Sequence, residues 1–363
     1  MRVVMNRQQL QQALKIASAV VPSRTVKPIL QFAKVVPADN VLIATNTEQT
    51  VEVALMADGK HREPFLVPVE RLLKIVSEHS CESIEIEHRG ENLDITLGRS
   101  EFHLQTASVD DFPLTTTSDA QPAAVVHAGK LQEYLGYCVK AVDRQSTRYA
   151  LGGVFFNMAA GALHLVATDS RRLVLCKPDC MSQADGPLGV IPLEALQVVL
   201  SSSYEHHVEI SADGNTATFT MGDYLTLSTQ LVSGRFPDYN KVVPASPNHL
   251  IVKPDELIPA LRQVQIMTSE ESRGVDLGQS EAVLQLAAKS SDVGTAKAEV
   301  AVASSVGELI SIRVDAKYML EACQPFKGLE SLAINYSDGD HAITFSSAEQ
   351  PDVLVVLMPL SKE

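Results

Sequence analysis

The residues of this chain with the clearest potential for chemistry form two small groups. Asp169 lies shortly before Arg172, and Glu205 directly precedes His206 and His207. Carboxylates beside a guanidinium or an imidazole could act in acid–base catalysis. However, the chain has no recognisable serine–histidine–aspartate arrangement, no glycine-rich phosphate-binding loop and no set of side chains at metal-ligand spacing. The sequence therefore predicts a protein that is not an enzyme and that needs no cofactor or metal.

Both groups also have a structural interpretation. Asp169 falls in a predicted turn, where an aspartate side chain normally supports the backbone. His206 and His207 follow a predicted helix, and imidazoles can cap the last carbonyls of a helix. Catalysis stays open as an alternative, which assays for nuclease, ATPase and hydrolase activity would test. Any turnover that Asp169→Ala abolished would favour it.

The cysteines and the apolar stretches indicate the compartment. Of five scattered cysteines, only Cys176 and Cys180 are close together, and no further ligand lies at metal-binding spacing. We expect reduced, structural thiols. No run of about 18 apolar residues could cross a bilayer, and the N-terminus does not resemble a signal peptide. These features predict a soluble, cytoplasmic protein with no membrane partner.

The charge is distributed unevenly along the chain. The net charge is −14, which argues against tight binding to nucleic acid, because phosphate neutralisation supplies most of that affinity. Yet residues 1–38 contain six basic residues and no acid, and Asp39 is the first carboxylate. A basic strip on an acidic protein would allow loose, sliding contact with DNA.

The chain contains three copies of one sequence unit, with a period near 120 residues, and this unit positions the residues described above. Each copy opens with an amphipathic helix, predicted at 7–21, 130–142 and 255–268. Paired strands follow, and the turn Asn46-Thr47-Glu48 matches Asp169-Ser170-Arg171, whereas the third copy has only a loose counterpart near 284–286. Each copy then has a strand that runs directly into a second helix, with proline in its first turn in two copies.

Each copy closes with alternating strands around a polar turn, and Asp-Gly at two of these turns is a good hairpin signal. Composition changes at 115–123 and 244–247 indicate linkers. We therefore predict an α+β protein of three repeated domains, 1–120, 121–246 and 247–363, each with two helices packed on antiparallel sheets.

At this level of detail the chain resembles the bacterial DNA polymerase III beta subunit, or sliding clamp, over essentially its full length. The motifs that carry the resemblance are Lys27-Pro28-Ile29-Leu30, Asp111-Phe112-Pro113, Arg148-Tyr149-Ala150-Leu151-Gly152-Gly153, Ala167-Thr168-Asp169-Ser170-Arg171-Arg172-Leu173, Gly234-Arg235-Phe236-Pro237-Asp238-Tyr239, Arg273-Gly274-Val275 and Met358-Pro359-Leu360. Each motif alone is weak, but their order and spacing together are specific.

The resemblance implies the DNA clamp fold and a ring of two subunits joined head to tail, whose helices line a central hole for duplex DNA. It places Phe102 and Leu104 of one subunit against Ile266 and Met267 of the other. Such a head-to-tail contact closes into a ring when its rotation permits. The residues expected to face DNA, without base readout, are Arg7, Lys15, Arg24, Lys74, Lys130, Lys140, Arg144, Gln145, Arg148, Tyr149, Arg262 and Arg273.

The resemblance also implies a pocket between the second and third domains that binds short peptides of the replicative DNA polymerase, the clamp loader and repair proteins. Its expected walls are Leu151, Thr168, Ser170, Arg172, Leu173, Pro237, Val242, Met358, Pro359 and Leu360. Core packing is the alternative interpretation of Leu173 and Val242.

Two positions depart from the family pattern. Ser170-Arg171 stands where the family usually has Gly-His, and Leu360 is followed by Ser361-Lys362-Glu363 instead of Arg-Leu. Both departures fall at the pocket, so its location is a firmer expectation than its peptide preference. The acidic net charge keeps a second function open, a three-repeat scaffold that binds proteins and does not encircle DNA.

Overall fold

The computed structural model describes residues 2–59, 62–113, 120–145, 150–182, 184–269, 273–280 and 282–361. These residues form two compact units. The first unit comprises 1–132 and 179–232, and the second comprises 133–178 and 233–363. The central repeat is therefore divided between the two units, and each unit is described here by itself.

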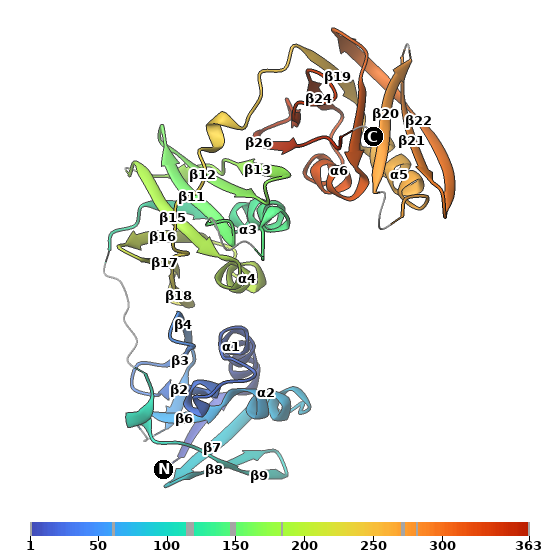
Figure 1. Ribbon diagram of the computed structural model, residues 1–363. Coiled ribbons are helices and arrows are strands. Elements are labelled where there is room, and N and C mark those ends of the chain that lie inside the picture. The colour runs from blue at the N-terminus through green and yellow to red at the C-terminus, as the bar shows by residue number, and fades with distance from the viewer. Residues whose placement is uncertain are drawn as a thin grey trace. The chain divides into compact units, whose positions relative to one another are not determined.

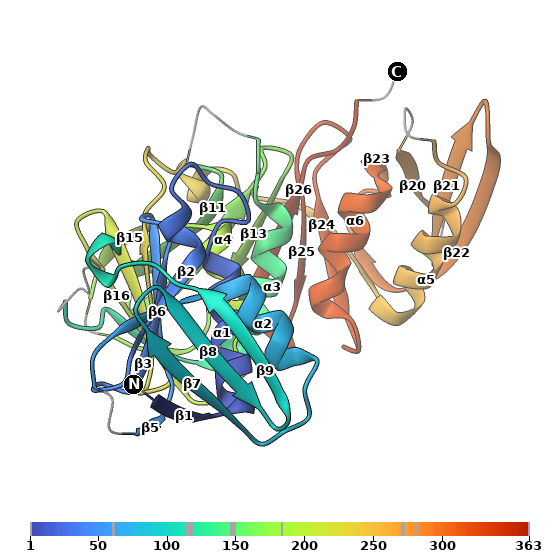
Figure 2. The same ribbon diagram turned by 90° about the horizontal axis from the view of Figure 1, so that it is seen from below.

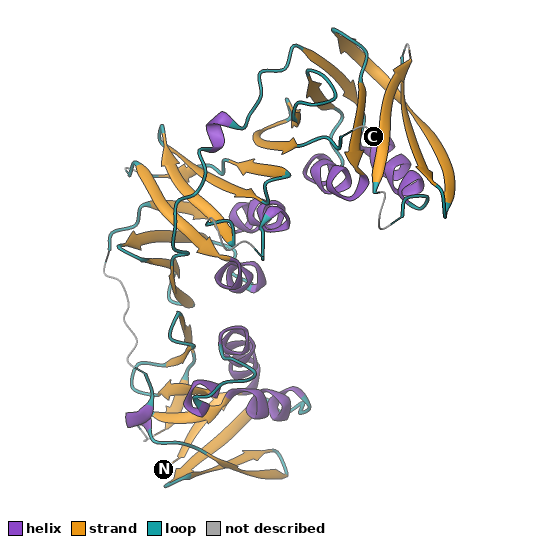
Figure 3. Cartoon of the chain, in the orientation of Figure 1, coloured by secondary structure: helices purple, strands orange, loops and turns teal. Residues whose placement is uncertain are grey.

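The first repeat runs from β1 to η2, with its helices beside its sheets (Figures 1 and 3). Its elements are β1 (Arg2–Asn6), α1 (Arg7–Val20), the 3₁₀ turn η1 (Pro28–Gln31), β2 (Phe32–Val36), β3 (Val41–Thr45), β4 (Gln49–Ala54), β5 (Ala57–Gly59), β6 (Phe65–Pro68), α2 (Val69–Ser77), β7 (Ser83–Arg89), β8 (Asn92–Leu97), β9 (Ser100–Gln105) and η2 (Val109–Asp111).

The central repeat follows the same order. Its elements are β10 (Ala124–His127), α3 (Ala128–Cys138), η3 (Val139–Ala141), β11 (Gly153–Ala159), β12 (Ala162–Thr168), β13 (Arg172–Cys176), β14 (Cys180–Met181), β15 (Gly186–Pro192), α4 (Leu193–Ser201), β16 (His207–Asp213), β17 (Thr216–Met221), β18 (Leu225–Gln230) and η4 (Tyr239–Lys241).

The third repeat has a similar order, but the single long strand β22 (Gly294–Val306) stands where the other repeats have two strands, and its 3₁₀ turn follows the second helix. Its helices α5 and α6 lie next to each other (Figure 2). Its elements are β19 (Asn248–Val252), α5 (Pro254–Gln265), β20 (Gly274–Ser280), β21 (Val283–Ser290), β22 (Gly294–Val306), β23 (Ser311–Asp315), α6 (Ala316–Cys323), η5 (Gln324–Phe326), β24 (Leu332–Tyr336), β25 (Ile343–Ser347) and β26 (Gln350–Leu357).

Antiparallel strand pairing joins neighbouring repeats inside each unit. In the first unit, one sheet has the order β14-β10-β16-β17-β18-β4-β3-β2-β6, so that β18 of the central repeat pairs with β4 of the first. A second sheet has the order β5-β1-β7-β8-β9. In the second unit, β26 of the third repeat pairs with β13 of the central repeat in the order β11-β12-β13-β26-β25-β24-β19-β22-β21-β20-β23. Each unit thus contains one sheet that crosses a repeat boundary.

The core of each unit is aliphatic, as the lack of tryptophan predicts. In α1 the side chains of Leu10, Leu14 and Ala17 are buried at helical spacing, and the helix packs against α2, α4, β3 and β4. The helix begins at Asn6, whose side chain accepts a hydrogen bond from the amide of Gln9 and so satisfies one free donor of the first turn. The predicted fold class, with two helices and antiparallel sheets in each repeat, is confirmed.

Several details differ from the sequence prediction. Pro68 and Pro192 end their strands and occupy the N-cap position, so they precede the first helical turn instead of lying in it. In the third repeat Asp315 takes this position and accepts hydrogen bonds from the amides of Lys317 and Tyr318. In the described part of the chain, no helix is both long enough and apolar enough to span a bilayer.

Candidate partner-binding and DNA-facing sites

The turn between β12 and β13 is held by the side chains of Thr168 and Asp169. Asp169 Oδ1 accepts hydrogen bonds from the amides of Arg171 and Arg172, each at 3.0 Å. Thr168 Oγ1 donates to the carbonyl of Arg172 and accepts from the amide of Ser170. These bonds hold Ser170 in the left-handed region, with φ of 71°. The carboxylate of Asp169 therefore supports the backbone, as the sequence predicts for a turn aspartate.

The first repeat contains the same turn between β3 and β4. Asn46 Oδ1 accepts from the amides of Glu48 and Gln49, at 3.0 and 2.7 Å. Thr45 Oγ1 donates to the carbonyl of Gln49 and accepts from the amide of Thr47, whose φ is 79°. The match between the two turns, predicted from the sequence, thus extends to individual hydrogen bonds.

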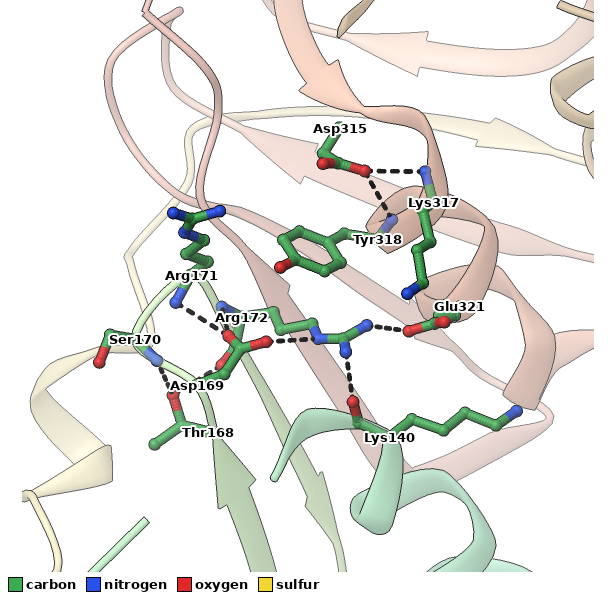
Figure 4. Close-up of polar contacts among 10 residues, drawn as sticks. All are labelled: Lys140, Thr168, Asp169, Ser170, Arg171, Arg172, Asp315, Lys317, Tyr318 and Glu321. Carbon is green, nitrogen blue, oxygen red and sulfur yellow. Dashed lines mark hydrogen bonds and ion pairs between the residues drawn. The ribbon is translucent and has the colours of Figure 1, made fainter. Parts of the chain in front are cut away.

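Arg172 links this turn to two other segments of the second unit (Figure 4). Its Nε donates to Asp169 Oδ2 at 3.0 Å, one terminal nitrogen pairs with Glu321 of α6, and the other donates to the carbonyl of Lys140. The guanidinium also lies 4.3 Å from the ring centre of Tyr318, in a cation–π contact. Its side chain is only 9% exposed. Arg172 is therefore a buried connection between segments as well as a predicted pocket wall.

The C-terminal segment lies against the same turn. The amide of Met358 donates to the carbonyl of Arg171, and the amide of Leu360 donates to the carbonyl of Arg313. Leu173 pairs with Val356 across the β13–β26 ladder. The structure thus brings together two groups of predicted pocket residues. They are Thr168, Ser170, Arg172 and Leu173 with Met358, Pro359 and Leu360.

The predicted walls differ in exposure. Leu151 and Leu173 are buried, each 2% exposed, whereas Met358 and Val242 are 42% and 41% exposed. Pro237 is half-buried. Leu151 and Leu173 thus contribute to the core, whereas Met358 and Val242 expose apolar side chains to solvent.

Sequence reasoning did not single out the residue that anchors the segment bearing Pro237 and Val242. The hydroxyl of Tyr239 lies 2.9 Å from His164 Nδ1 and accepts a hydrogen bond from Asn157. Burial, with a smaller effect of Lys177, lowers the pKa of His164, which keeps this imidazole neutral near pH 7. The sequence signal was the Gly234–Tyr239 motif, which served only as a family marker.

The predicted DNA-facing residues of the first repeat divide into exposed cations and one that is held by the protein. Lys15, Arg24 and Lys74 are exposed. Arg7 instead donates to the carbonyls of Cys81 and Val76, at 2.8 and 3.1 Å, and to Gln11. A cation at this point balances the negative end of α2. Arg7 therefore has a structural role beside its predicted one.

A hollow of about 610 Å³ lies between the end of α1 and the start of α2. Lys74 and the exposed Arg71 line it, together with Glu70. Arg71 lies between Glu70 and Leu72, in the segment that the sequence predicts as a strand running into a helix, and no family motif marks it. It adds a second cation beside Lys74.

The other predicted DNA-facing residues lie on helices or in loops. Arg148 and Tyr149 fall outside the described residues, so their prediction is unchanged. The exposed ones are Lys130, Lys140, Arg144, Gln145, Arg262 and Arg273.

The predicted contact residues between subunits lie beside two unpaired strand edges. β9, which carries the half-buried Phe102 and Leu104, is the last strand of its sheet. The first half of β22 pairs with β21 on one side, and no described strand pairs with its other side. Ile266 is 71% exposed, and the sulfur of Met267 lies beside Gly294 at the start of β22. Unpaired edges of this kind are templates for a strand from another chain.

The two histidines of the alternative catalytic group each pack against another aromatic ring. His207 lies in β16, where its ring packs edge-on against His127, and His206 packs against Tyr204. The prediction that these histidines cap α4 is wrong, because Gln132 donates to the carbonyls of Val199 and Ser202 at that helix end. No group of three potential metal ligands occurs within the described ranges.

The cysteines are all free thiols in this structure. Cys138, Cys176 and Cys323 are buried, and burial raises the pKa of both Cys176 and Cys323. These last two thiols are therefore protonated and unreactive at neutral pH.

Three repeats of paired helices on antiparallel sheets, joined by strands across the repeat boundaries, define a DNA clamp fold. Sequence models of the DNA polymerase III beta subunit match the chain in order: the N-terminal domain at residues 1–116, the central domain at 126–238 and the C-terminal domain at 240–361. The chain belongs to the DNA polymerase III beta subunit family.

Individual relatives agree with this assignment. The beta sliding clamp of Chlamydia pneumoniae is 30% identical over 99% of both chains, and that of Pseudomonas aeruginosa is 26% identical over 99% of this chain and 100% of its own. Among solved structures, the Bacillus subtilis sliding clamp matches over the full length of both chains with a TM-score of 0.93 at 20% identity. The Pseudomonas aeruginosa clamp bound to griselimycin has a TM-score of 0.92 at 25% identity, also over both full chains.

Proposed function

We propose that this protein is a DNA sliding clamp, the processivity factor of the replicative DNA polymerase. Two copies join head to tail into a ring that encloses duplex DNA and slides along it without sequence preference. The ring tethers the polymerase, the clamp loader and repair proteins through short peptide motifs. The protein acts in the cytoplasm, at the nucleoid, and is itself not an enzyme.

The observation that carries this proposal is the repeated way in which one repeat joins the next. The last strand of the central repeat, β18, pairs with β4 of the first repeat, and the last strand of the third repeat, β26, pairs with β13 of the central repeat. The last strand of the first repeat, β9, has its outer edge free, and β22 offers the edge that corresponds to β4 and β13. A second copy can satisfy both edges, which closes a ring of six domains, bounded in each chain as 1–120, 121–246 and 247–363.

The DNA-facing surface follows from the exposed cations on the helices and adjoining loops. Lys15, Arg24, Lys74 and Arg262 place positive charge there, although the whole chain carries −14. Phosphate contacts of this kind carry no base information and weaken as salt rises. An acidic exterior repels DNA, so retention depends on enclosure more than on affinity.

The partner site is the apolar surface around Met358 and Val242. Backbone hydrogen bonds fix the segment that carries Met358 beside the turn at Ser170. Exposed apolar side chains suit the anchor residues of an extended peptide. The side chains at Ser170 and Arg171 stand at the rim, and they shift the peptide preference from that of relatives with other residues there.

Retention on circular DNA tests the function directly. The protein is loaded onto nicked plasmid by a clamp-loader ATPase, isolated by gel filtration, and the plasmid is then linearised. A sliding clamp stays on the circle and leaves the linear form at moderate salt. Equal retention on both forms would remove the clamp function and favour the alternative, a three-repeat scaffold that binds only proteins.

A further inference from the structure

The two junctions between repeats have the same register. In the first unit, a row of buried residues crosses the junction from Phe219 to Leu227, then to Val51 and Ala44. In the second unit, the corresponding row runs from Phe345 to Val355, then to Val174 and Ala167. In each row the second residue belongs to the last strand of one repeat and the third residue to the neighbouring repeat. The strands at both junctions are therefore paired in the same register, with the second residue of each row directly opposite the third.

The unpaired edges hold the two halves of a third row. In the β8–β9 ladder Ile95 lies opposite Phe102, and these two residues correspond to Phe219 and Leu227 of the central repeat. Ala288 is opposite Ala296 in the β21–β22 ladder, and Leu286-Ala287-Ala288 matches Leu42-Ile43-Ala44 and Leu165-Val166-Ala167. In the register of the two junctions within the chain, Phe102 of one copy lies opposite Ala296 of the other.

This register brings opposite charges together on the outer face of the ladder. Glu101, which precedes Phe102 in β9, becomes the direct partner of Lys297, which follows Ala296 in β22. Arg99, in the turn between β8 and β9, then comes opposite Glu299. All four side chains are exposed. The corresponding pairs at the junctions within the chain are Thr226 with Glu52 and Leu354 with Leu175. Neither of these pairs carries charge on both strands. One step further along the same face, at the position of Arg99 and Glu299, the second junction does bring Lys177 beside Asp352. The opposite charges that distinguish the unpaired edges are therefore those of Glu101 and Lys297.

Other registers bring like charges face to face. A slip of two residues in one direction places Glu101 opposite Glu299, and a slip in the other direction places Arg99 opposite Lys297. A slip of one residue turns Phe102 and Leu104 to the outer face of the sheet. Like charges directly opposite each other destabilise a pair of strands.

We propose that Glu101 with Lys297, and Arg99 with Glu299, form ion pairs between two copies of this chain and thereby select one register and a self-complementary partner. This inference rests on the proposed head-to-tail assembly and specifies its partner as a second copy of the same chain. Charge complementarity of this kind fixes the register and suppresses wrong partners.

Charge exchange tests the pairing. Glu101→Lys and Lys297→Glu are each expected to raise the dimer dissociation constant at least roughly tenfold, because each places like charges at both interfaces of the ring. The double variant, which restores opposite charges with reversed polarity, is expected to return to within about threefold of the parent. Glu91→Lys, the same charge change on the β7–β8 hairpin, is the control and leaves dimerisation unchanged. Sedimentation equilibrium measures all four proteins.

A cross-link tests the register independently of stability. In a chain with Cys81→Ser and Cys180→Ser, His103→Cys with Thr295→Cys is expected to give an oxidised dimer, and His103→Cys with Lys297→Cys is not. Single variants that behave like Glu91→Lys, together with failure of the first cross-link, overturn this register. If these variants still form dimers that are retained on circular DNA, the proposed clamp function stands and only the proposed register is wrong. If the parent protein does not dimerise, both the proposed function and the register are wrong.

Discussion

The amide nitrogen of Met358 donates a hydrogen bond to the carbonyl oxygen of Arg171 over 2.8 Å. In the other unit, the amide of Gln230 makes the equivalent bond to the carbonyl of Glu48 over 2.9 Å. The last strand of a repeat is therefore fixed beside the turn of the neighbouring repeat, through its final residue at Gln230 and through the residue directly after it at Met358. At Met358 the bonded residue carries an exposed apolar side chain.

Met358→Ala combined with Leu360→Ala is expected to abolish stimulation of the polymerase, while loading onto DNA stays measurable. Removing two apolar anchors from a peptide site typically weakens binding by about 2 kcal/mol or more. Met181→Ala, at a similarly exposed methionine in β14, is the matched control. Primer-extension length and peptide titration measure the effect. Loss of dimerisation with partner binding intact would contradict the assignment of the pocket.

Arg172→Ala is expected to lower the free energy of unfolding by about 3 kcal/mol, because it leaves the carboxylates of Asp169 and Glu321 without their buried partner. Arg171→Ala, at the exposed neighbouring position, is expected to stay within about 0.5 kcal/mol of the parent. Urea denaturation of both variants gives the difference. Equal stability of the two variants would show that the contacts in Figure 4 contribute little.

Arg24→Ala is expected to weaken DNA binding and to reduce its salt dependence, because a cation that neutralises a phosphate releases counterions from the DNA. The slope of log affinity against log salt should fall by roughly 0.9 for each phosphate that the variant no longer neutralises. Arg89→Ala is the control, since Arg89 pairs with Glu87 and Asp94 on a hairpin that carries no predicted DNA-facing residue. An unchanged slope for Arg24→Ala would remove this residue from the DNA-facing set.

Arg7→Ala is expected to destabilise the protein by about 1–2 kcal/mol, because the carbonyls at the end of α2 lose a charged donor. Lys15→Ala, two turns further along the same helix at an exposed position, should leave stability nearly unchanged. Thermal unfolding compares the two variants. The salt slope of DNA binding for Arg7→Ala then reports separately on its predicted phosphate contact.

The pair His341 and Asp338 gives a pH-dependent signature in the last hairpin. Their hydrogen bond raises the pKa of His341 and lowers the pKa of Asp338. The contribution of His341 to stability is complete below its unfolded pKa and disappears as pH rises through its folded pKa. The contribution of Asp338 is complete above its unfolded pKa and is lost as pH falls through its folded value. The pair is thus favourable between these limits, in the mildly acidic range.

Proton NMR of the His341 ring checks this prediction. In the parent protein the ring should titrate above an unperturbed histidine, and Asp338→Asn should return it to the ordinary value. His79, which contacts Ser100 and no carboxylate in the described part of the chain, is the internal control. A titration of His341 that Asp338→Asn leaves unchanged would exclude this hydrogen bond as the cause.

Much of the fold could be predicted because the same local patterns recur three times. The first helix, predicted at 7–21, is α1 (Arg7–Val20), and the helix predicted at 255–268 is α5 (Pro254–Gln265), so only the ends differ. Helix ends depend on which groups cap them, and capping by Gln132 from a distant helix cannot be read from local spacing. The third copy looked divergent around Leu284 because Ala287 stands where the first two copies have Ile43 and Val166, although β21 and β22 still pair as an antiparallel hairpin.

The sites were predicted less completely, for a physical reason. The family resemblance assigns a role to a residue from its position in the sequence. It therefore assigned Arg172 to the peptide pocket and Arg7 to the DNA-facing surface. It does not carry the partners that surround a charged group in space, and both guanidiniums are engaged by carbonyls far away in sequence. Met358 and Arg24 are exposed to solvent, whereas Arg172 and Arg7 are engaged in hydrogen bonds within the protein.

Ser170 and Thr47 occupy equivalent turns with left-handed backbones, a conformation that glycine adopts without strain and a β-branched threonine adopts with the most. The left-handed conformation therefore costs each turn roughly 1 kcal/mol of stability, and a glycine at the same position would remove this cost. For protein engineering, these two positions are sites where Ser170→Gly or Thr47→Gly could raise the melting temperature while the neighbouring ladders stay intact. At position 170 the same change would also remove a side chain from the rim, so thermal tolerance and ligand choice would have to be tuned together.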